Sequence, residues 1–181
     1  KRAMGVRAAS VAVAAMLAGA LCAPAAAHAE YRGHQDLDEG HWAVPEVIDW
    51  SKDHRAVNGF PDGSWAPDAP ITREQVATII HNASGAPVPA GPATFADAGQ
   101  LTWSADAVAW CQQQGIFTGS GNLMMPADPI TREQVAKVLM VYAGGAEADD
   151  AALAAFADGA EVSGWARGVC SWAARSGVVK G

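Results

Sequence analysis

The sequence predicts an all-α fold made of tandem helix-loop-helix repeats of about 60 residues. The hexapeptide Ile-Thr-Arg-Glu-Gln-Val at 71–76 recurs unchanged at 130–135, 59 residues later. Six of the seven tryptophans fall in three pairs, and a glycine follows the second Trp of each pair by nine residues. The pairs are Trp42 and Trp50, Trp103 and Trp110, and Trp165 and Trp172. Two full repeats and the start of a third are therefore expected.

Residues 1–29 have the pattern of a cleaved export signal, with a basic start, an apolar stretch and the small-residue site Ala27-His28-Ala29. We expect cleavage after Ala29 and a secreted mature chain. No later segment approaches 18 consecutive apolar residues, so no membrane span is expected once the signal is removed. Lipid attachment at Cys22 is a weaker alternative, because the bulky Leu21 precedes it.

The repeats and their linkers follow from the spacing. We place the first repeat at 30–85, a linker at 86–93, the second repeat at 94–145, a linker at 146–154, and a truncated third repeat at 155–181. Two amphipathic helices in so short a unit bury little apolar surface alone, so the repeats are expected to pack on one another.

The first helix of each repeat is marked by apolar residues at helical spacing. Ala107, Trp110 and Cys111 lie at positions i, i+3 and i+4, and Gly115 follows as a left-handed C-terminal cap. The third repeat has the same pattern at Val169, Trp172, Ala173 and Gly177. A glycine-containing turn then leads to the second helix.

The second helix is predicted to begin at a capping box. Thr72 with Gln75, and Thr131 with Gln134, have the required spacing of three residues. Apolar stripes follow at helical spacing and are expected in the core together with Trp50 and Trp110. Their members are Val76, Ile79, Ile80 and Ala83, then Val135, Val138, Leu139 and Tyr142.

The charge excludes some partners. The chain has 19 acidic and 12 basic residues, and the signal carries three of the basic residues and no acid. The mature chain is therefore strongly acidic. Nucleic-acid binding through a broad basic surface is excluded, and so is unpatterned attraction to an anionic membrane.

These elements resemble the S-layer homology domain family. The resemblance rests on Asp-Leu-Asp-Glu-Gly-His-Trp at 36–42, Gly-Phe-Pro-Asp-Gly at 59–63, Pro67, and the repeated Ile-Thr-Arg-Glu-Gln element. It implies three copies in a three-pronged, pseudo-threefold helical bundle with ligand in grooves between the prongs. It also implies a cell-wall location and non-covalent anchoring of an exported protein through an anionic, often pyruvylated, secondary cell-wall polysaccharide.

The sequence departs from the family pattern in three places. The common Thr-Arg-Ala-Glu element is Thr-Arg-Glu-Gln here, which moves the acid by one position. His34 stands where the other repeats have Phe95 and Phe156. The third copy stops at Gly181 before its own loop and second helix, and the chain opens with Lys1, so an incomplete reading frame is expected.

Arg73 and Arg132 are the leading candidate ligand-binding residues. If the preceding threonines are N-caps, each arginine occupies the first helical position, where a cation is disfavoured by about 0.3–1 kcal/mol. Exposed helix N–H groups beside a guanidinium form a good site for a carboxylate or phosphate. The alternative is a salt bridge between repeats to Asp36 or Asp97, and the family resemblance favours the ligand.

Four further residues are candidates for the same site. Trp42 and Trp103 could stack on sugar rings, although a packing anchor at the helix start is the favoured interpretation. Asp36 and Asp97, with Asp158 in the third repeat, could bond a sugar hydroxyl, although capping of the first helix is favoured.

The sequence predicts no catalytic residue, metal site or cofactor. It lacks a Gly-x-Ser-x-Gly element and a phosphate loop, and its histidines lack the spacing of metal ligands. Cys111 and Cys170 are expected as small buried hydrophobes, with a disulfide between them as the alternative.

Three functions are consistent with these patterns. The first is a cell-wall anchor that binds an anionic glycan. The second is the targeting region of an exported cell-wall hydrolase whose catalytic domain lies beyond the sequence. The third is a self-assembling protein-protein scaffold. The sequence does not predict the oligomeric state.

Overall fold

The computed structural model describes residues 36–37, 41, 44 and 56–180. This part of the chain is helical, has no β-strand, and contains only two isolated β-bridges. The predicted signal, Trp42, Trp50, His34 and His54 lie outside the described residues. Within them, no helix is long and apolar enough to cross a membrane.

The helices follow one another as the repeat pattern predicts. The α-helices are α3 (Arg73–Ala83), α4 (Ala105–Gln113), α5 (Arg132–Tyr142) and α6 (Arg167–Arg175). Short 3₁₀ helices lie between them: η2 (Ala98–Gln100), η3 (Asp150–Ala155) and η4 (Gly164–Ala166). The second predicted linker, 146–154, therefore includes most of the helix η3, and its Leu153 is buried.

Local capping signals define the helix ends. Thr72 and Thr131 are the N-caps of α3 and α5, and both predicted capping boxes are formed with Gln75 and Gln134. Gly115 and Gly177 follow α4 and α6 with φ values of 70° and 72°. A glycine tolerates this left-handed conformation without strain, so these predictions are confirmed.

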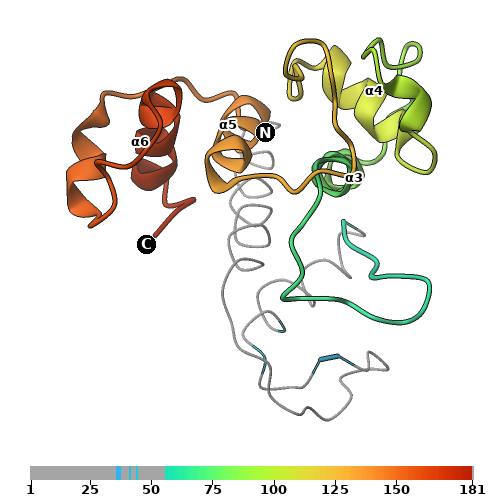
Figure 1. The fold of residues 1–181 in the computed structure, drawn as a ribbon, viewed down its shortest axis with the longest axis horizontal. Coiled ribbons are helices and arrows are strands. Elements are labelled where there is room, and N and C mark those ends of the chain that lie inside the picture. The colour runs from blue at the N-terminus through green and yellow to red at the C-terminus, as the bar shows by residue number, and fades with distance from the viewer. Residues whose placement is uncertain (1–35, 38–40, 42–43, 45–55, 181) are drawn as a thin grey trace.

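Packing crosses the repeat boundaries. Helix α3 packs on α4, and α5 packs on α6, so the second helix of one repeat lies against the first helix of the next (Figure 1). Their apolar faces meet in one cluster, whose fully buried side chains include Val76, Ile80, Val108, Cys111, Leu139 and Val169. The structure confirms the predicted burial of Ile79, Val135 and Val138 as well.

Three predicted core positions are less buried than expected. Trp110, Ala83 and Tyr142 are half-buried at the edge of the core. The ring centroids of Trp110 and His81 lie 5.6 Å apart. Trp65, which the sequence places in a loop, instead packs against the buried Leu37 and Val44, so its environment is not that of an ordinary loop residue.

The loop of the second repeat is fixed by Gly119. Its φ is 72°, and a Cβ atom there would lie 2.7 Å from the Leu123 carbonyl oxygen and 2.8 Å from the ring of Phe95. Both the backbone conformation and the close approach therefore require glycine. Gly59, at the same place in the first repeat, also has a positive φ, of 70°, so the left-handed conformation explains the glycine in both described repeats.

Both described cysteines are free thiols. Cys111 is fully buried, its Sγ lies 3.5 Å from the Ala77 carbonyl oxygen, and burial raises its pKa to about 12. Cys170 is half-buried, and its pKa is raised first by burial and then by Glu133, against the effect of Arg132. The predicted role as a buried hydrophobe is confirmed for Cys111.

Candidate functional site

Arg73 is a buried link between repeats. Only 7% of the residue is exposed. Its Nε donates to the Met124 carbonyl oxygen at 2.6 Å, and its Nη1 donates to Gln134 Oε1 at 3.3 Å. Its guanidinium carbon lies 5.6 Å from the centroid of the Phe117 ring. The side chain is therefore committed to the second repeat.

The N-terminus of α3 is closed to a ligand. The Arg73 N–H donates to the Asp128 carbonyl and the Glu74 N–H to the Pro126 carbonyl, each at 3.0 Å. The third N–H, of Gln75, donates to the Thr72 hydroxyl. The prediction of an open anion site at Arg73 is therefore wrong.

The alternative of a link between repeats is supported at Arg73, but with different partners. The guanidinium binds a carbonyl and an amide instead of the expected carboxylate of Asp36 or Asp97. Burial lowers the pKa of Arg73, and the nearby charges of Asp128 and Asp97 act against this effect.

Arg132 has the opposite environment. It lies at the same position of the same hexapeptide, yet it is exposed at the start of α5. Thr131 Oγ1 accepts the Gln134 N–H, as in the first repeat. Among the described residues, none accepts a hydrogen bond from the N–H of Arg132 or Glu133. Within the described part of the chain, this helix end therefore keeps two backbone donors and a guanidinium that could bind a ligand.

The acid of the hexapeptide joins each repeat to the next. Glu74 Oε2 accepts from the Ser104 hydroxyl at 2.6 Å, and Glu133 Oε1 accepts from the Ser163 N–H at 2.7 Å. Ser104 and Ser163 are the N-caps of α4 and η4. The displaced acid thus makes a charge-assisted hydrogen bond instead of an ion pair. The sequence analysis noted the displaced acid but did not predict the serine partners of Glu74 and Glu133.

Exposed tryptophans adjoin these junctions. Trp103 precedes Ser104 and is 60% exposed, and Trp165 lies two residues after Ser163 and is 55% exposed. The favoured prediction of a packing anchor is therefore wrong for Trp103. Trp165 was not predicted as a site residue, although it was recognised as part of the third tryptophan pair. It lies in η4, which contacts α5, the helix that begins at Arg132.

Asp97 fastens the loop that precedes the second helix. Its Oδ1 accepts the Met124 N–H at 2.8 Å, and its Oδ2 accepts the Met125 N–H at 2.7 Å. It caps neither η2 nor α4, so the predicted capping role is wrong. Burial acts to raise the pKa of Asp97, but these two N–H groups and Arg73 outweigh it, and the pKa lies below its ordinary value.

Asp36 makes the same clamp in the first repeat. Its carboxylate accepts the N–H groups of Trp65 and Ala66, at 2.9 and 2.5 Å. Ala66 and Met125 both have positive φ, of 52° and 50°, although neither is glycine. The clamp therefore holds a strained turn at the same place in both repeats. Asp158 is exposed in the third.

Replacing Asp97 with Ala is expected to lower the free energy of unfolding by about 1–3 kcal/mol at neutral pH, because two backbone N–H groups lose a charged acceptor. The folded-state pKa of Asp97 lies below its ordinary value of 3.8. The contribution of Asp97 to the free energy of unfolding is therefore complete above pH 3.8 and is lost as the pH falls through the lower folded-state pKa.

Thermal melting of both proteins at pH 7 and at about pH 2 checks this linkage. The difference in melting temperature should shrink in acid. Asp68→Ala, at an exposed carboxylate, is the matched control. Equal melting temperatures of Asp97→Ala and the parent at pH 7 would contradict the clamp.

No metal site is formed by the residues that the structure describes. His81 is buried, and its Nε2 lies 2.8 Å from the Pro87 carbonyl oxygen, which makes that nitrogen the donor.

Comparison with known proteins identifies two repeats. The model of the S-layer homology domain matches residues 36–77 and 94–136 and does not extend to 155–181. The chain is 31% identical over 175 residues, or 96% of its length, to the surface-layer 125 kDa protein of Lysinibacillus sphaericus. It is 34% identical over 130 residues, or 70% of its length, to an S-layer protein of Bacillus licheniformis.

Similarity extends to enzymes. The chain is 27% identical over 144 residues, or 78% of its length, to the exoglucanase XynX of Acetivibrio thermocellus. It covers 13% of that enzyme and 14% of each of the two surface-layer proteins. The chain therefore corresponds to a small part of each relative.

Proposed function

Because the chain belongs to the S-layer homology domain family through its two matched repeats, we propose that it anchors an exported protein by binding a secondary cell-wall polysaccharide. The family and the surface-layer relatives place the chain outside the cell, at the cell surface or wall. The S-layer homology domain is a binding and anchoring module, and we assign no catalytic activity to this chain.

The open N-terminus of α5 is the observation that carries the proposal. An exposed guanidinium lies there beside two backbone N–H groups that have no acceptor among the described residues, and groups of these kinds bind anions. A carboxylate or phosphate on a glycan is an acceptor that this arrangement fits. The equivalent end of α3 offers no such donors, because the second repeat already occupies them.

The exposed Trp165 supports a sugar ligand. Its turn is fixed to α5 by the hydrogen bond from the Ser163 N–H to Glu133, one residue from Arg132. A fixed, exposed indole offers an apolar face to a sugar ring. We propose that Arg132 binds the anionic substituent and that Trp165 contacts the ring beside it.

The remaining candidates divide into two groups. The exposed Trp103 is proposed as a second sugar-stacking residue, and Trp42 as its counterpart in the first repeat. Arg73, Asp36 and Asp97 are proposed to hold the frame of the site, because their polar atoms are engaged within the protein.

Sedimentation with purified cell walls tests the function. The chain should bind intact walls and lose that binding on walls from which the secondary polysaccharide has been extracted. Addition of the extracted polysaccharide should compete with intact walls. Equal binding to both wall preparations would reject the polysaccharide as ligand.

A further inference from the structure

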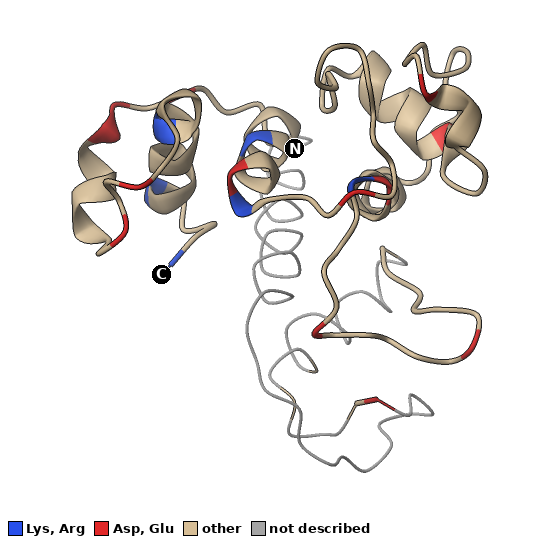
Figure 2. Cartoon of the chain, in the orientation of Figure 1, with Lys and Arg blue, Asp and Glu red and all other residues tan. Residues whose placement is uncertain are grey.

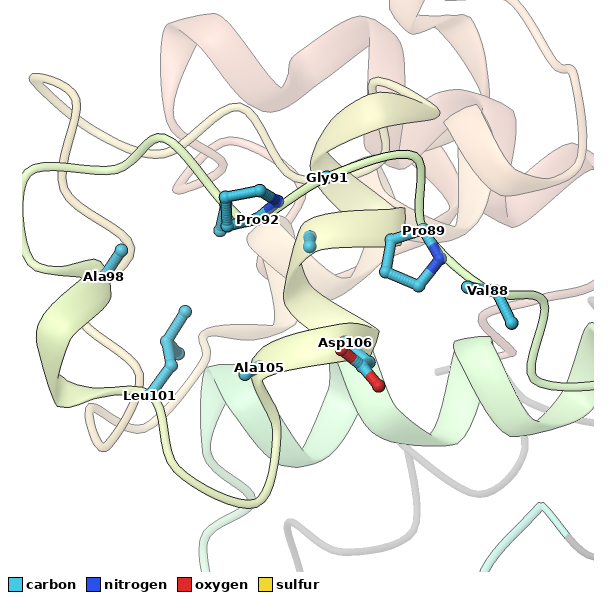
Figure 3. A pocket seen from close by; sticks show the side chains of 10 residues that line it. Val88, Pro89, Gly91, Pro92, Ala98, Leu101, Ala105 and Asp106 are labelled. Atoms are coloured by element: carbon cyan, nitrogen blue, oxygen red, sulfur yellow. The ribbon is translucent and has the colours of Figure 1, made fainter.

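A groove of about 340 Å³ lies between linker residues 88–93 and α4 (Figure 3). Its walls are mainly proline rings and small apolar side chains, and they include one charged group. Six of the residues that line the groove are Pro89, Pro92, Leu101, Ala105, Ala109 and Asp106.

Two glutamines hold the linker in place. Gln113 Oε1 accepts the Ala90 N–H, and its Nε2 donates to the Gly91 carbonyl, both at 2.9 Å. Gln112 Oε1 accepts the Thr94 N–H at 2.7 Å. Two prolines further restrict the linker backbone, so the groove is formed in advance of any ligand.

The third repeat shows the same place closed. When Trp103 and Trp110 are aligned with Trp165 and Trp172, Gly168 aligns with Asp106. The second linker lies directly on α6, and its Ala148 N–H donates to the Gly168 carbonyl at 3.1 Å. A Cβ atom at Gly168 would lie 3.0 Å from Glu147 Cβ, so a larger residue at this position would push the linker away from α6 by a few tenths of an ångström.

Two substitutions open the groove in the second repeat. The 59-residue spacing puts Pro89 in the place of Ala148, and proline has no N–H to donate to the helix. Asp106 has the side chain that Gly168 lacks. The linker is therefore held only at the last residues of α4, by Gln112 and Gln113, and leaves a groove beside Ala105, Asp106 and Ala109.

The charges of the two helices also differ. On α6, Arg175 and Arg167 pair with Asp149 and Asp150 of the second linker, at 2.6 and 2.9 Å. Helix α4 contains Asp106 and no Lys or Arg (Figure 2). No described residue forms an ion pair or hydrogen bond with Asp106. The groove thus combines apolar walls with a carboxylate that has no partner in the described part of the chain.

We propose that this groove binds a lysine side chain of an extended partner peptide. The methylene stem would lie between the proline rings and the alanine face of α4, and the ammonium would meet the Asp106 carboxylate. Charge complementarity favours a cation, and the small lining residues favour a thin aliphatic stem. The adjacent Val88 is 91% exposed and adds apolar surface at the rim for the peptide.

Amide chemical shifts of the ¹⁵N-labelled full chain provide the test. The probe is acetyl-Ala-Lys-Ala-amide, and the matched control replaces lysine with norleucine, which keeps the stem and removes the ammonium. Titration extends to about 20 mM, because one anchored side chain gives at best weak affinity. We expect saturable shifts at Val88, Gly91 and Ala105 with the lysine peptide only.

Three variants define the site. Asp106→Asn should weaken binding of the lysine peptide by about tenfold. Asp68→Asn, at an exposed carboxylate outside the groove, should leave the affinity for the peptide unchanged. Gly91→Leu, which adds a large side chain at a residue that lines the groove, should weaken binding of the lysine peptide. A Cβ atom at Gly91 meets no atom within 4 Å, so the fold should persist, and circular dichroism checks this.

Equal shifts with the norleucine peptide, or unchanged affinity in Asp106→Asn, would overturn the proposal. So would sedimentation that shows self-association through this groove without competition by the peptide, because a second copy would then be the occupant. This inference does not depend on the glycan site. Wall binding by Asp106→Asn should equal that of the parent, so failure of one proposal is distinguishable from failure of the other.

Discussion

Replacing Arg132 with Ala is expected to weaken binding to purified cell walls by about 1.5–3 kcal/mol, or roughly 10- to 150-fold. The exposed guanidinium makes no hydrogen bond within the described residues, so its removal should leave the fold intact. Its loss removes charge-assisted donors from the open end of α5. Sedimentation measures wall binding, and thermal melting measures stability in the same preparation.

Lysine at this position separates charge from geometry. Arg132→Lys keeps the positive charge but loses the planar, two-pronged donor arrangement. We expect weaker wall binding with little change in melting temperature. An unchanged wall affinity for both Arg132 variants, measured per folded molecule, would remove Arg132 from the site.

Arg73→Ala is the matched control within the same hexapeptide. Its guanidinium binds Met124 and Gln134 and lies over Phe117, so truncation should lower stability. The melting temperature should fall for Arg73→Ala and stay constant for Arg132→Ala. The same substitution in two copies of one motif should therefore lower stability at Arg73 and weaken wall binding at Arg132.

The identical hexapeptides show what sequence reasoning can and cannot predict. Thr72 and Thr131 form the same capping box because that motif depends on residues three positions apart. The adjacent arginines differ because segment 124–128 covers the first helix end, while no described segment covers the second in the same way. Local sequence determines the cap, and the tertiary neighbour determines access.

Helix positions and apolar faces were predictable for the same reason. The stripes on α3 and α5 repeat at helical spacing, and both are buried as expected except at their last members, Ala83 and Tyr142, which are half-buried. The links from Asp97 to Met124 and from Glu74 to Ser104 join residues about 30 positions apart, and no local pattern specifies such partners. The exposure of Trp103 likewise depends on the path of the neighbouring repeat and not on its own helix.

Truncating Leu139 to Ala should lower the free energy of unfolding by about 2–5 kcal/mol, because a cavity adds to the lost transfer free energy. Leu139 is 1% exposed and lies in the cluster that joins α3, α4, α5 and α6. Its loss should therefore weaken contacts of both helix pairs together. Denaturant unfolding followed by circular dichroism measures the change.

Leu123→Ala is the matched control, since it makes the same chemical change at a side chain that is 39% exposed. Removal of partly solvated atoms leaves no enclosed cavity, so the expected loss is well below that at Leu139. A core shared between repeats also predicts a single transition for Leu139→Ala, shifted to lower denaturant. If the two variants lose equal stability, or if Leu139→Ala unfolds in two separate steps, the shared core between repeats is not the main source of stability.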